Sequence, residues 1–229
     1  MKAYTKYAII VSGGTGNRMA SELPKQFLEL NDLPILMHSI AAFNRDEQTK
    51  IILVLNKEHE HIWKQLCAKH LFKIPHTIVH GGENRFQSVK NGLEFIKSSE
   101  FNLKKVLIAV HDGVRPLVDQ NIIKNGFDAA EVFGSAVPTV KSKDSVRMMD
   151  GSGQSKALDR DSVLLVQTPQ IFKADLLVAA YHQEFDNSFT DDASVIEKSG
   201  HSIHIIEGNI RNIKITYPID LKIAEMWIV

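Results

Sequence analysis

The feature that most constrains the fold is a repeated alternation of short apolar runs with amphipathic segments. Residues 7–12 form an apolar run that ends in glycines, which is typical of a buried strand. Residues 84–97 place Phe86, Val89 and Leu93 on one face of a helix. Strands that alternate with helices usually pair in parallel, with helices on both faces. We therefore expect an α/β fold with a mostly parallel sheet flanked by helices.

The same patterns give boundaries for the individual elements. The expected strands are 7–12, 51–55, 76–80, 106–110, 135–140, 163–167, 202–206 and 213–216. The expected helices are 34–44, 58–70, 84–97, 119–133, 173–184, 191–199 and 218–227.

Residues 141–160 interrupt the alternation, because they are polar and charged. Gly151-Ser152-Gly153 is typical of a hairpin turn between 146–149 and 156–158. This segment is predicted to be a β-arm that projects from the body. The alternation then resumes without an internal repeat, a low-complexity tract or a linker, so we expect one domain over 1–229.

Composition excludes several classes of protein. The chain has 229 residues, 44% of them hydrophobic, which is enough for a core in one domain. Lys plus Arg and Asp plus Glu both number 27, so the basic bias of a non-specific nucleic-acid binder is missing. Cys67 is the only cysteine, which excludes an intrachain disulfide. With no signal core and no apolar run approaching about 18 residues, we expect a cytoplasmic protein without a membrane partner.

The first segment with chemical potential is the glycine-rich stretch 12–19, followed by Lys25 in 24–27. Backbone N–H groups in such a turn approach phosphate oxygens closely, and the nearby Arg18 and Lys25 could stabilise a phosphorane-like transition state. An ordinary strand-to-helix turn with surface cations is the alternative. The stretch is not a P-loop, and Met19 stands where the dinucleotide fingerprint needs glycine.

Two further segments follow predicted strands. Gly81-Gly82 would let a planar base lie against the backbone, and Ser88 could bond a base or ribose edge; the alternative is a glycine turn with Asn84 as helix cap. Asp112 follows a central strand, where ligands of open α/β sheets bind, so it could hold Mg²⁺ against triphosphate oxygens. The alternative for Asp112 is a helix cap or an ion pair with Arg115, and a structural role is favoured for His111.

The last segments are 168–170, 190–194 and 212–216. Lys214 lies within the strand expected at 213–216, between Ile213 and Ile215, which face the other way. A lysine there needs solvent or a charged partner, and a phosphate is a suitable partner. An edge-strand lysine in solvent remains the alternative.

Together these motifs resemble the IspD-like cytidylyltransferases along the whole chain. The resemblance is carried by Gly-Gly-x-Gly-x-Arg-Met, Pro-Lys-Gln-Phe, Gly-Gly-Glu-x-Arg-x-x-Ser-Val, His-Asp-x-x-Arg-Pro, Thr-Pro-Gln, Thr-Asp-x-Ala-Ser and Asn-Ile-Lys-Ile-Thr. It implies a Rossmann-like nucleotidyltransferase fold and transfer of CMP from CTP to a sugar-alcohol phosphate. It favours methylerythritol phosphate over ribitol 5-phosphate as the acceptor. A non-catalytic protein on the same fold would be expected to lack Arg18, Lys25 or Lys214, and all three are present.

The resemblance also implies residue roles. Arg18 and Lys25 would stabilise the transition state, while Arg160 and Lys214 would position the acceptor phosphate. The CTP site would comprise Ser12, Gly13, Gly14, Gly16, Gly82, Glu83, Ser88 and Asp112, with Asp112 also on Mg²⁺. Arg115, Ser145 and Thr168 would line the acceptor pocket. The 141–160 arm would cross to the other subunit of a homodimer.

The chain departs from the family pattern at three places. Ser12-Gly13 stands where two alanines are common, and Ser145 keeps the hydroxyl of a common threonine. Residues 209–211 lack a carboxylate that some members carry, so a second protein ligand for the metal is not expected. A nicotinamide-dependent oxidoreductase is disfavoured, because Asn56-Lys57 replaces the acid expected after the second strand.

Overall fold

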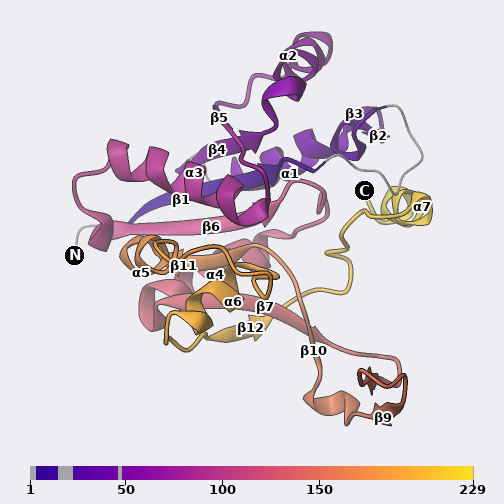
Figure 1. The fold of residues 1–229 in the computed structure, drawn as a ribbon. Helices are drawn as coiled ribbons and strands as arrows, with labels where there is room; N and C mark the ends of the chain where they lie inside the picture. The colour runs from indigo at the N-terminus through magenta and orange to yellow at the C-terminus, as the bar shows by residue number, and fades with distance from the viewer. Residues whose placement is uncertain (1–3, 15–22, 46–47, 229) are drawn as a thin grey trace.

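A twisted sheet runs through the centre of the protein (Figure 1). The computed structural model describes residues 4–14, 23–45 and 48–228. At the centre, β1 (Thr5–Ser12) lies parallel to β4 (Thr49–Leu55) and to β6 (Val106–Asp112), and β5 (Thr77–His80) continues the parallel set beyond β4. Since parallel strands share a direction, their carboxyl ends meet at one edge. The register pairs Val11 with Asp112 there.

The second half of the sheet is mixed. The strand β11 (Gln170–Lys173) runs antiparallel between β6 and β7 (Ser135–Lys141). Two more strands pair with β7: β10 (Leu164–Val166) is antiparallel to it and β12 (Ile205–Glu207) is parallel. The expected mostly parallel α/β sheet is therefore confirmed, with antiparallel strands in its second half.

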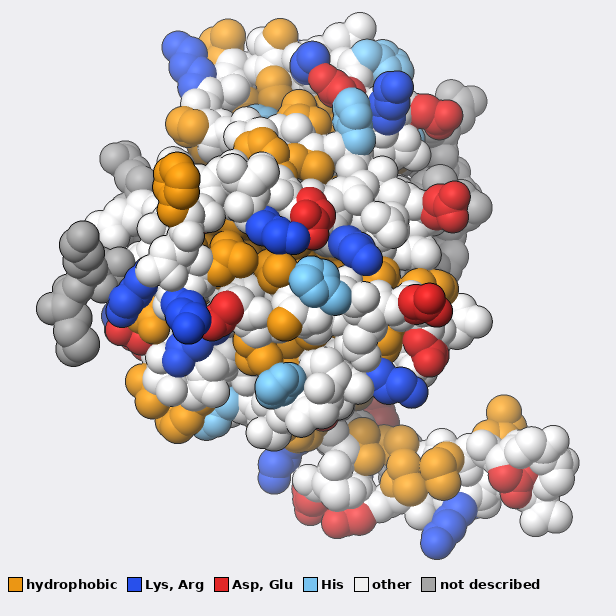
Figure 2. All heavy atoms as spheres, turned by 60° about the vertical axis from the view of Figure 1, so that its left-hand side comes forward, with side chains coloured by type: hydrophobic (Ala, Val, Ile, Leu, Met, Phe, Trp, Pro, Cys, Tyr) orange, Lys and Arg blue, Asp and Glu red, His pale blue; other side chains and the backbone are white. Residues whose placement is uncertain are grey.

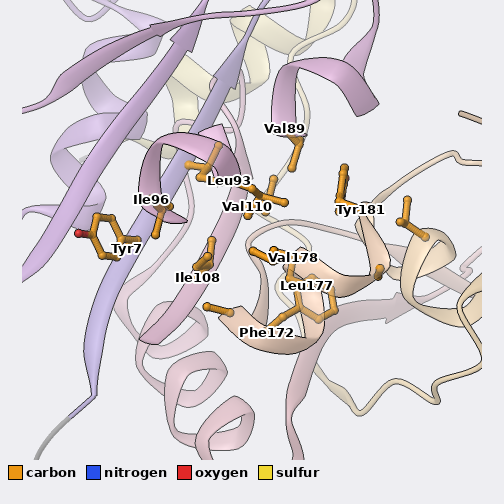
Figure 3. Close-up of a cluster of buried hydrophobic side chains, with 14 of the residues drawn as sticks. Tyr7, Val89, Leu93, Ile96, Ile108, Val110, Phe172, Leu177, Val178 and Tyr181 are labelled. Atoms are coloured by element: carbon orange, nitrogen blue, oxygen red, sulfur yellow. The ribbon is translucent and has the colours of Figure 1, made fainter. Parts of the chain in front are cut away.

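Helices cover both faces of the sheet. One face packs against α3 (Arg85–Ser99), α5 (Ala174–Ala180) and α6 (Asp192–Lys198), where Val89, Leu93 and Ile96 lie close to Ile108 and Val110 (Figure 3). The other face packs against α1 (Ile35–Phe43), α2 (Glu60–Lys69) and α4 (Gln120–Phe133). Neighbouring residues of each strand point to opposite faces, so a continuous apolar run fills both cores.

A smaller apolar cluster supports the carboxyl edge of the sheet. The two-residue strands β2 (Glu29–Leu30) and β3 (Leu33–Pro34) form a hairpin beside α7 (Pro218–Trp227). Leu30, Val114 and Ile215 are buried together in this cluster. The packing fixes the chain on either side of Lys214 against the loop that follows β6.

The expected arm is confirmed. Between β7 and β10 the chain leaves the body and forms the hairpin of β8 (Arg147–Met149) and β9 (Ser155–Ala157) (Figure 1). Its turn contains Gly153 in the left-handed region, with φ of +83°, which glycine tolerates best. A 3₁₀ turn, η5 (Arg160–Ser162), leads back to β10. Other 3₁₀ turns are η2 (Lys25–Phe27), η3 (Lys57–His59) and η4 (Leu103–Lys105).

Several local predictions were wrong. Residues 213–216 form no strand: the Ile215 N–H donates to Val114 O, a single 2.9 Å bond rather than a ladder. The strand β11 and the β2–β3 hairpin were missed, because four-residue and two-residue strands are too short to show a period. The helix expected over 173–184 is the shorter α5, with Lys173 in β11. Within the described residues, no helix is long and apolar enough to cross a membrane.

Candidate active site

A pocket of about 380 Å³ opens at the carboxyl ends of β1 and β6. Its walls come from the loops after β1, β5 and β6 and from Lys214. The lining residues are Val11, Ser12, Gly13, Gly14, Lys25, Gln26, Gly82, Glu83, Asn84, Arg85, Ser88, Asp112, Val114 and Lys214. The glycine segments that are far apart in the sequence therefore face one cavity.

The loop before α3 is fixed by short hydrogen bonds. Ser88 Oγ accepts from the Gly82 N–H at 3.1 Å, and Asn84 Oδ1 accepts from the Gln87 N–H at 2.8 Å as the N-cap of α3. A Cβ at Gly82 would lie 2.2 Å from Gln87 Cγ, so a larger residue would force this loop to shift. Asn84 thus caps the helix while Gly82 and Ser88 line the pocket.

The loop after β1 is held by Gln26, a residue for which the sequence predicted no role. Its side chain is buried, and Nε2 donates to Ser12 O at 3.3 Å and to Gly14 O at 3.4 Å. The neighbouring Lys25 donates from Nζ to Ile215 O at 3.0 Å, which draws its ammonium group toward Lys214. Gly16 and Arg18 lie outside the described residues.

Asp112 is the electrostatic centre of the site. Its Oδ2 accepts from Arg115 Nε at 3.1 Å and lies 3.1 Å from Lys214 Nζ, while its Oδ1 lies 4.0 Å from Arg85 Nε. Burial opposes ionisation of this carboxyl, but Lys214, Arg85 and Arg115 outweigh it and hold the pKa of Asp112 below its usual range. The ion pair with Arg115 that the sequence left open is present, and Asp112 also lines the pocket.

His111 has the structural role favoured from the sequence. It is fully buried, its Nε2 faces Arg115 O at 3.1 Å, and its Nδ1 lies 3.0 Å from Thr168 Oγ1. Because Arg115 O can only accept, Nε2 carries the ring proton, and Nδ1 then accepts from the Thr168 hydroxyl, whose oxygen accepts in turn from the Asp112 N–H at 3.1 Å. A neutral ring protonated on Nε2 fits both partners. Burial lowers the pKa of His111 to about 4.

A second, smaller pocket adjoins the first. It has a volume of about 250 Å³, and its lining residues are Arg85, Asp112, Arg115, Val166, Gln167, Thr168, Gln170, Thr190, Asp191 and Lys214. Arg85, Asp112 and Lys214 line both pockets. The two cavities therefore meet at a junction of three charged side chains.

Two predicted site residues lie elsewhere in the chain. Ser145 and Arg160 are exposed on the arm and line neither pocket. The sequence reasoning also missed Arg85 and its partner Asp192, which are 107 residues apart. Arg85 is part of the motif around Gly82, and a charged residue within such a motif was the one feature of the sequence that could have indicated a place in the site.

The glycine loops, the cations and the buried Asp112 carboxylate at the carboxyl edge of a mostly parallel sheet define a nucleotidyltransferase of the α/β class. Residues 7–229 match the family model for 2-C-methyl-D-erythritol 4-phosphate cytidylyltransferase, IspD. The chain belongs to this family.

Individual relatives agree with the family match. The 2-C-methyl-D-erythritol 4-phosphate cytidylyltransferase of Bacteroides fragilis is 49% identical over 218 residues, or 95% of this chain and 96% of the relative. Among solved structures, the 4-diphosphocytidyl-2C-methyl-D-erythritol synthase of Anaerococcus prevotii is 28% identical with a TM-score of 0.81, over 98% of this chain and 96% of the other. The cytidylyltransferase of Thermus thermophilus is 27% identical with a TM-score of 0.75, over 98% of both chains.

Proposed function

We propose that this protein transfers CMP from CTP to 2-C-methyl-D-erythritol 4-phosphate, giving 4-diphosphocytidyl-2-C-methyl-D-erythritol and pyrophosphate. The observation that carries the proposal is the pair of adjoining pockets, one lined by glycine loops and both lined by Asp112 and Lys214. A two-substrate transfer needs such a junction, because the acceptor phosphate must reach the α-phosphorus of the nucleotide. The proposed compartment is the cytoplasm.

The transfer is a displacement at phosphorus. An oxygen of the acceptor phosphate forms a bond to the α-phosphorus while the bond to the bridging oxygen breaks, and the electron pair leaves with pyrophosphate. Lys25 would stabilise the negative charge that builds on the reacting phosphate, together with Arg18. Lys214 would hold the acceptor phosphate, with Arg115 and Thr168 in the same pocket.

The donor set is compatible with Mg²⁺ held mainly by the triphosphate. Among the described residues, no cluster of three or more His, Cys, Asp or Glu side chains could hold a metal. One carboxylate, Asp112, lies at the junction, and Mg²⁺ bound to nucleotides commonly uses one or two protein carboxylates plus phosphate oxygens. When bound, the ion would neutralise triphosphate charge. Activity is expected to be lost with EDTA and restored by Mg²⁺; full turnover without a divalent ion would contradict this role.

The nucleotide base would lie against Gly82 and Glu83, with Ser88 orienting it. The 4-amino group of cytosine is a donor where uracil has an acceptor, and such a mismatch leaves a buried group unpaired. CTP should therefore be used far better than UTP, ATP or GTP. Comparable turnover of ATP and CTP would contradict this assignment.

The direct test is pyrophosphate release with CTP and each of two acceptors. We expect turnover with 2-C-methyl-D-erythritol 4-phosphate and little with ribitol 5-phosphate. The reverse preference would identify the second acceptor as the substrate. Absence of release with either would contradict the transferase assignment.

The active form is proposed to be a homodimer joined through the arm. Hydrophobic side chains gather on the projecting arm and at its base (Figure 2). Met149 is 73% exposed and Leu165 is 50% exposed in the single chain, which is a large apolar surface to leave in water. A two-fold dimer would bury it and would bring Arg160 and Ser145 to the partner's second pocket.

Mixing two inactive variants tests the shared site. Lys25→Ala chains refolded or coexpressed with Arg160→Ala chains would give mixed dimers with one doubly defective site and one intact site. Half of randomly paired dimers are mixed, so roughly a quarter of wild-type activity should return. No recovery, with mixed dimers shown to be present, would mean that Arg160 acts within its own chain, because every site would then carry one defect.

A further inference from the structure

The third charged residue at the junction of the two pockets has no role so far. Arg85 is the first residue of α3, and its side chain lines both cavities. A cation in the first turn of a helix opposes the helix dipole, so the stability of α3 does not explain it. The presence of an arginine at position 85 therefore needs another explanation.

A buried carboxylate holds this cation in one orientation. Asp192, the first residue of α6, is fully buried, and its two oxygens accept from Arg85 Nη1 at 3.1 Å and Nη2 at 2.6 Å. The buried Tyr181 hydroxyl donates to Asp192 Oδ1 at 2.6 Å. A two-bond pair fixes the plane of a guanidinium group as well as its distance. Arg85 Nε is thereby directed at Asp112 Oδ1, 4.0 Å away.

The pair also affects the charge that the pockets present. Arg85 lines both cavities, whereas Asp192 is fully buried and lines neither. The pair therefore turns its positive end toward the cavities, and the neutral exchange of both residues would remove that charge from the cavity walls. A fixed positive charge in a partly buried site attracts phosphates more strongly than a mobile surface charge does.

We propose that Arg85 is a positioning residue for the transfer reaction, and that Asp192 and Tyr181 hold its guanidinium beside Asp112 where the two substrate pockets meet. The proposal rests on the function proposed above, because it assumes that both pockets receive phosphates. Arg85 acts through Asp112, whose carboxylate it keeps oriented, and through the positive charge that it adds to the junction.

The test exchanges the ion pair for a neutral pair of the same hydrogen-bonding capacity. Arg85→Gln alone leaves Asp192 buried without a counter-charge, so its melting temperature should fall. Arg85→Gln combined with Asp192→Asn restores a bonded amide pair and should melt close to the wild type. Its kcat/KM for the acceptor should nevertheless stay roughly 10- to 100-fold below wild type, and the Kd for CTP with Mg²⁺ should rise severalfold.

A matched control lies at the other end of α3. Lys50 Nζ lies 3.0 Å from Glu100 Oε1, which also accepts from the Tyr7 hydroxyl at 2.7 Å, and none of these residues lines either pocket. Lys50→Gln with Glu100→Gln is the corresponding exchange of a cation–carboxylate pair. Its kcat/KM and Kd for CTP should equal those of the wild type.

A neutral Arg85–Asp192 pair with kcat/KM within about threefold of wild type would overturn the proposal, because the ion pair would then serve folding alone. Should the double variant fail to fold, Arg85→Lys decides the question: it keeps the charge but loses the planar fork, so kcat should fall about 10-fold in a stable protein. A stable Arg85→Lys enzyme with wild-type kcat would contradict the proposal. Wild-type protein that releases no pyrophosphate would instead refute the proposed function.

Discussion

The two ends of α3 carry clusters of similar chemistry in different surroundings. At its start, Arg85 pairs with Asp192, which also binds the Tyr181 hydroxyl. At its end, Glu100 pairs with Lys50 and binds a tyrosine hydroxyl from β1. The side chains of Arg85 and Asp192 are 28% and 0% exposed, whereas those of Lys50 and Glu100 are 57% and 19% exposed.

A cation, a carboxylate and a tyrosine thus occur together in two settings, and of these two clusters the Arg85 cluster is the one that reaches the pockets of the candidate site. The Glu100 cluster lies at the amino edge of the parallel strands, where Tyr7 and Lys50 are partners in the β1–β4 register. Water screens such an exposed pair. The Arg85 cluster lies at the carboxyl edge, where glycine loops leave room for a ligand. Burial lowers the effective dielectric there, so the electrostatic interactions between charged groups are stronger. The two clusters therefore differ in which end of the parallel strands they lie beside.

The largest effect is expected for Lys25→Ala at the carboxyl edge. In the proposed mechanism Lys25 faces charge that builds up in the transition state, so kcat should fall by ~10²-fold, or about 3 kcal/mol, with a much smaller change in KM. Steady-state pyrophosphate release measures both constants. Lys50→Ala at the amino edge is the control and should retain wild-type kcat. Near wild-type kcat in Lys25→Ala would contradict the prediction that cations at the carboxyl edge matter more for turnover than cations at the amino edge.

Acid should destabilise the carboxyl edge through His111. Its pKa is lowered to about 4 in the folded protein and returns to about 6.5 on unfolding, so the unfolded chain binds the extra proton in this window. Stability is fully present above pH 6.5 and is lost as the pH falls toward 4, by about 2 kcal/mol at pH 5.

Urea unfolding at pH 8 and pH 5 measures this loss. The comparison with His111→Asn isolates the contribution of this histidine from that of the others. The variant should be less stable at pH 8 and should lose less on acidification. Equal losses in both proteins would mean that His111 is not held neutral by the fold.

The smallest effect is expected for Glu100→Gln at the amino edge. The Tyr7 hydroxyl and Lys50 lower the pKa of Glu100, yet the pair is open to water. Glutamine still accepts from Tyr7, so unfolding free energy should change by less than about 1 kcal/mol and kcat should not change. A fall in kcat as large as that of the Arg85 variants would break the comparison between the two ends.

The sequence was sufficient wherever the controlling interactions are local. Alternating apolar runs predicted the α/β sheet, the polar segment 141–160 predicted the arm, and Asn84 was recognised as a possible cap for α3. Glycines next to strand ends indicated the loops that line the larger of the two adjoining pockets. Strand period, capping and turn chemistry each depend on a few neighbouring residues, so they can be read along the chain.

Only the tertiary structure decided which charges from distant parts of the chain meet. The sequence placed Lys214 in a strand, but Lys214 lies in an irregular segment, where the neighbouring Ile215 N–H donates to Val114 O, and it pairs with Asp112. Arg85 and Asp192 are far apart in the chain, and no local pattern connects them. A buried charge needs a counter-charge nearby, and the packing of distant elements determines which one is available. Here Arg85 and Asp192 meet because α3 and α6 pack on the same face of the sheet.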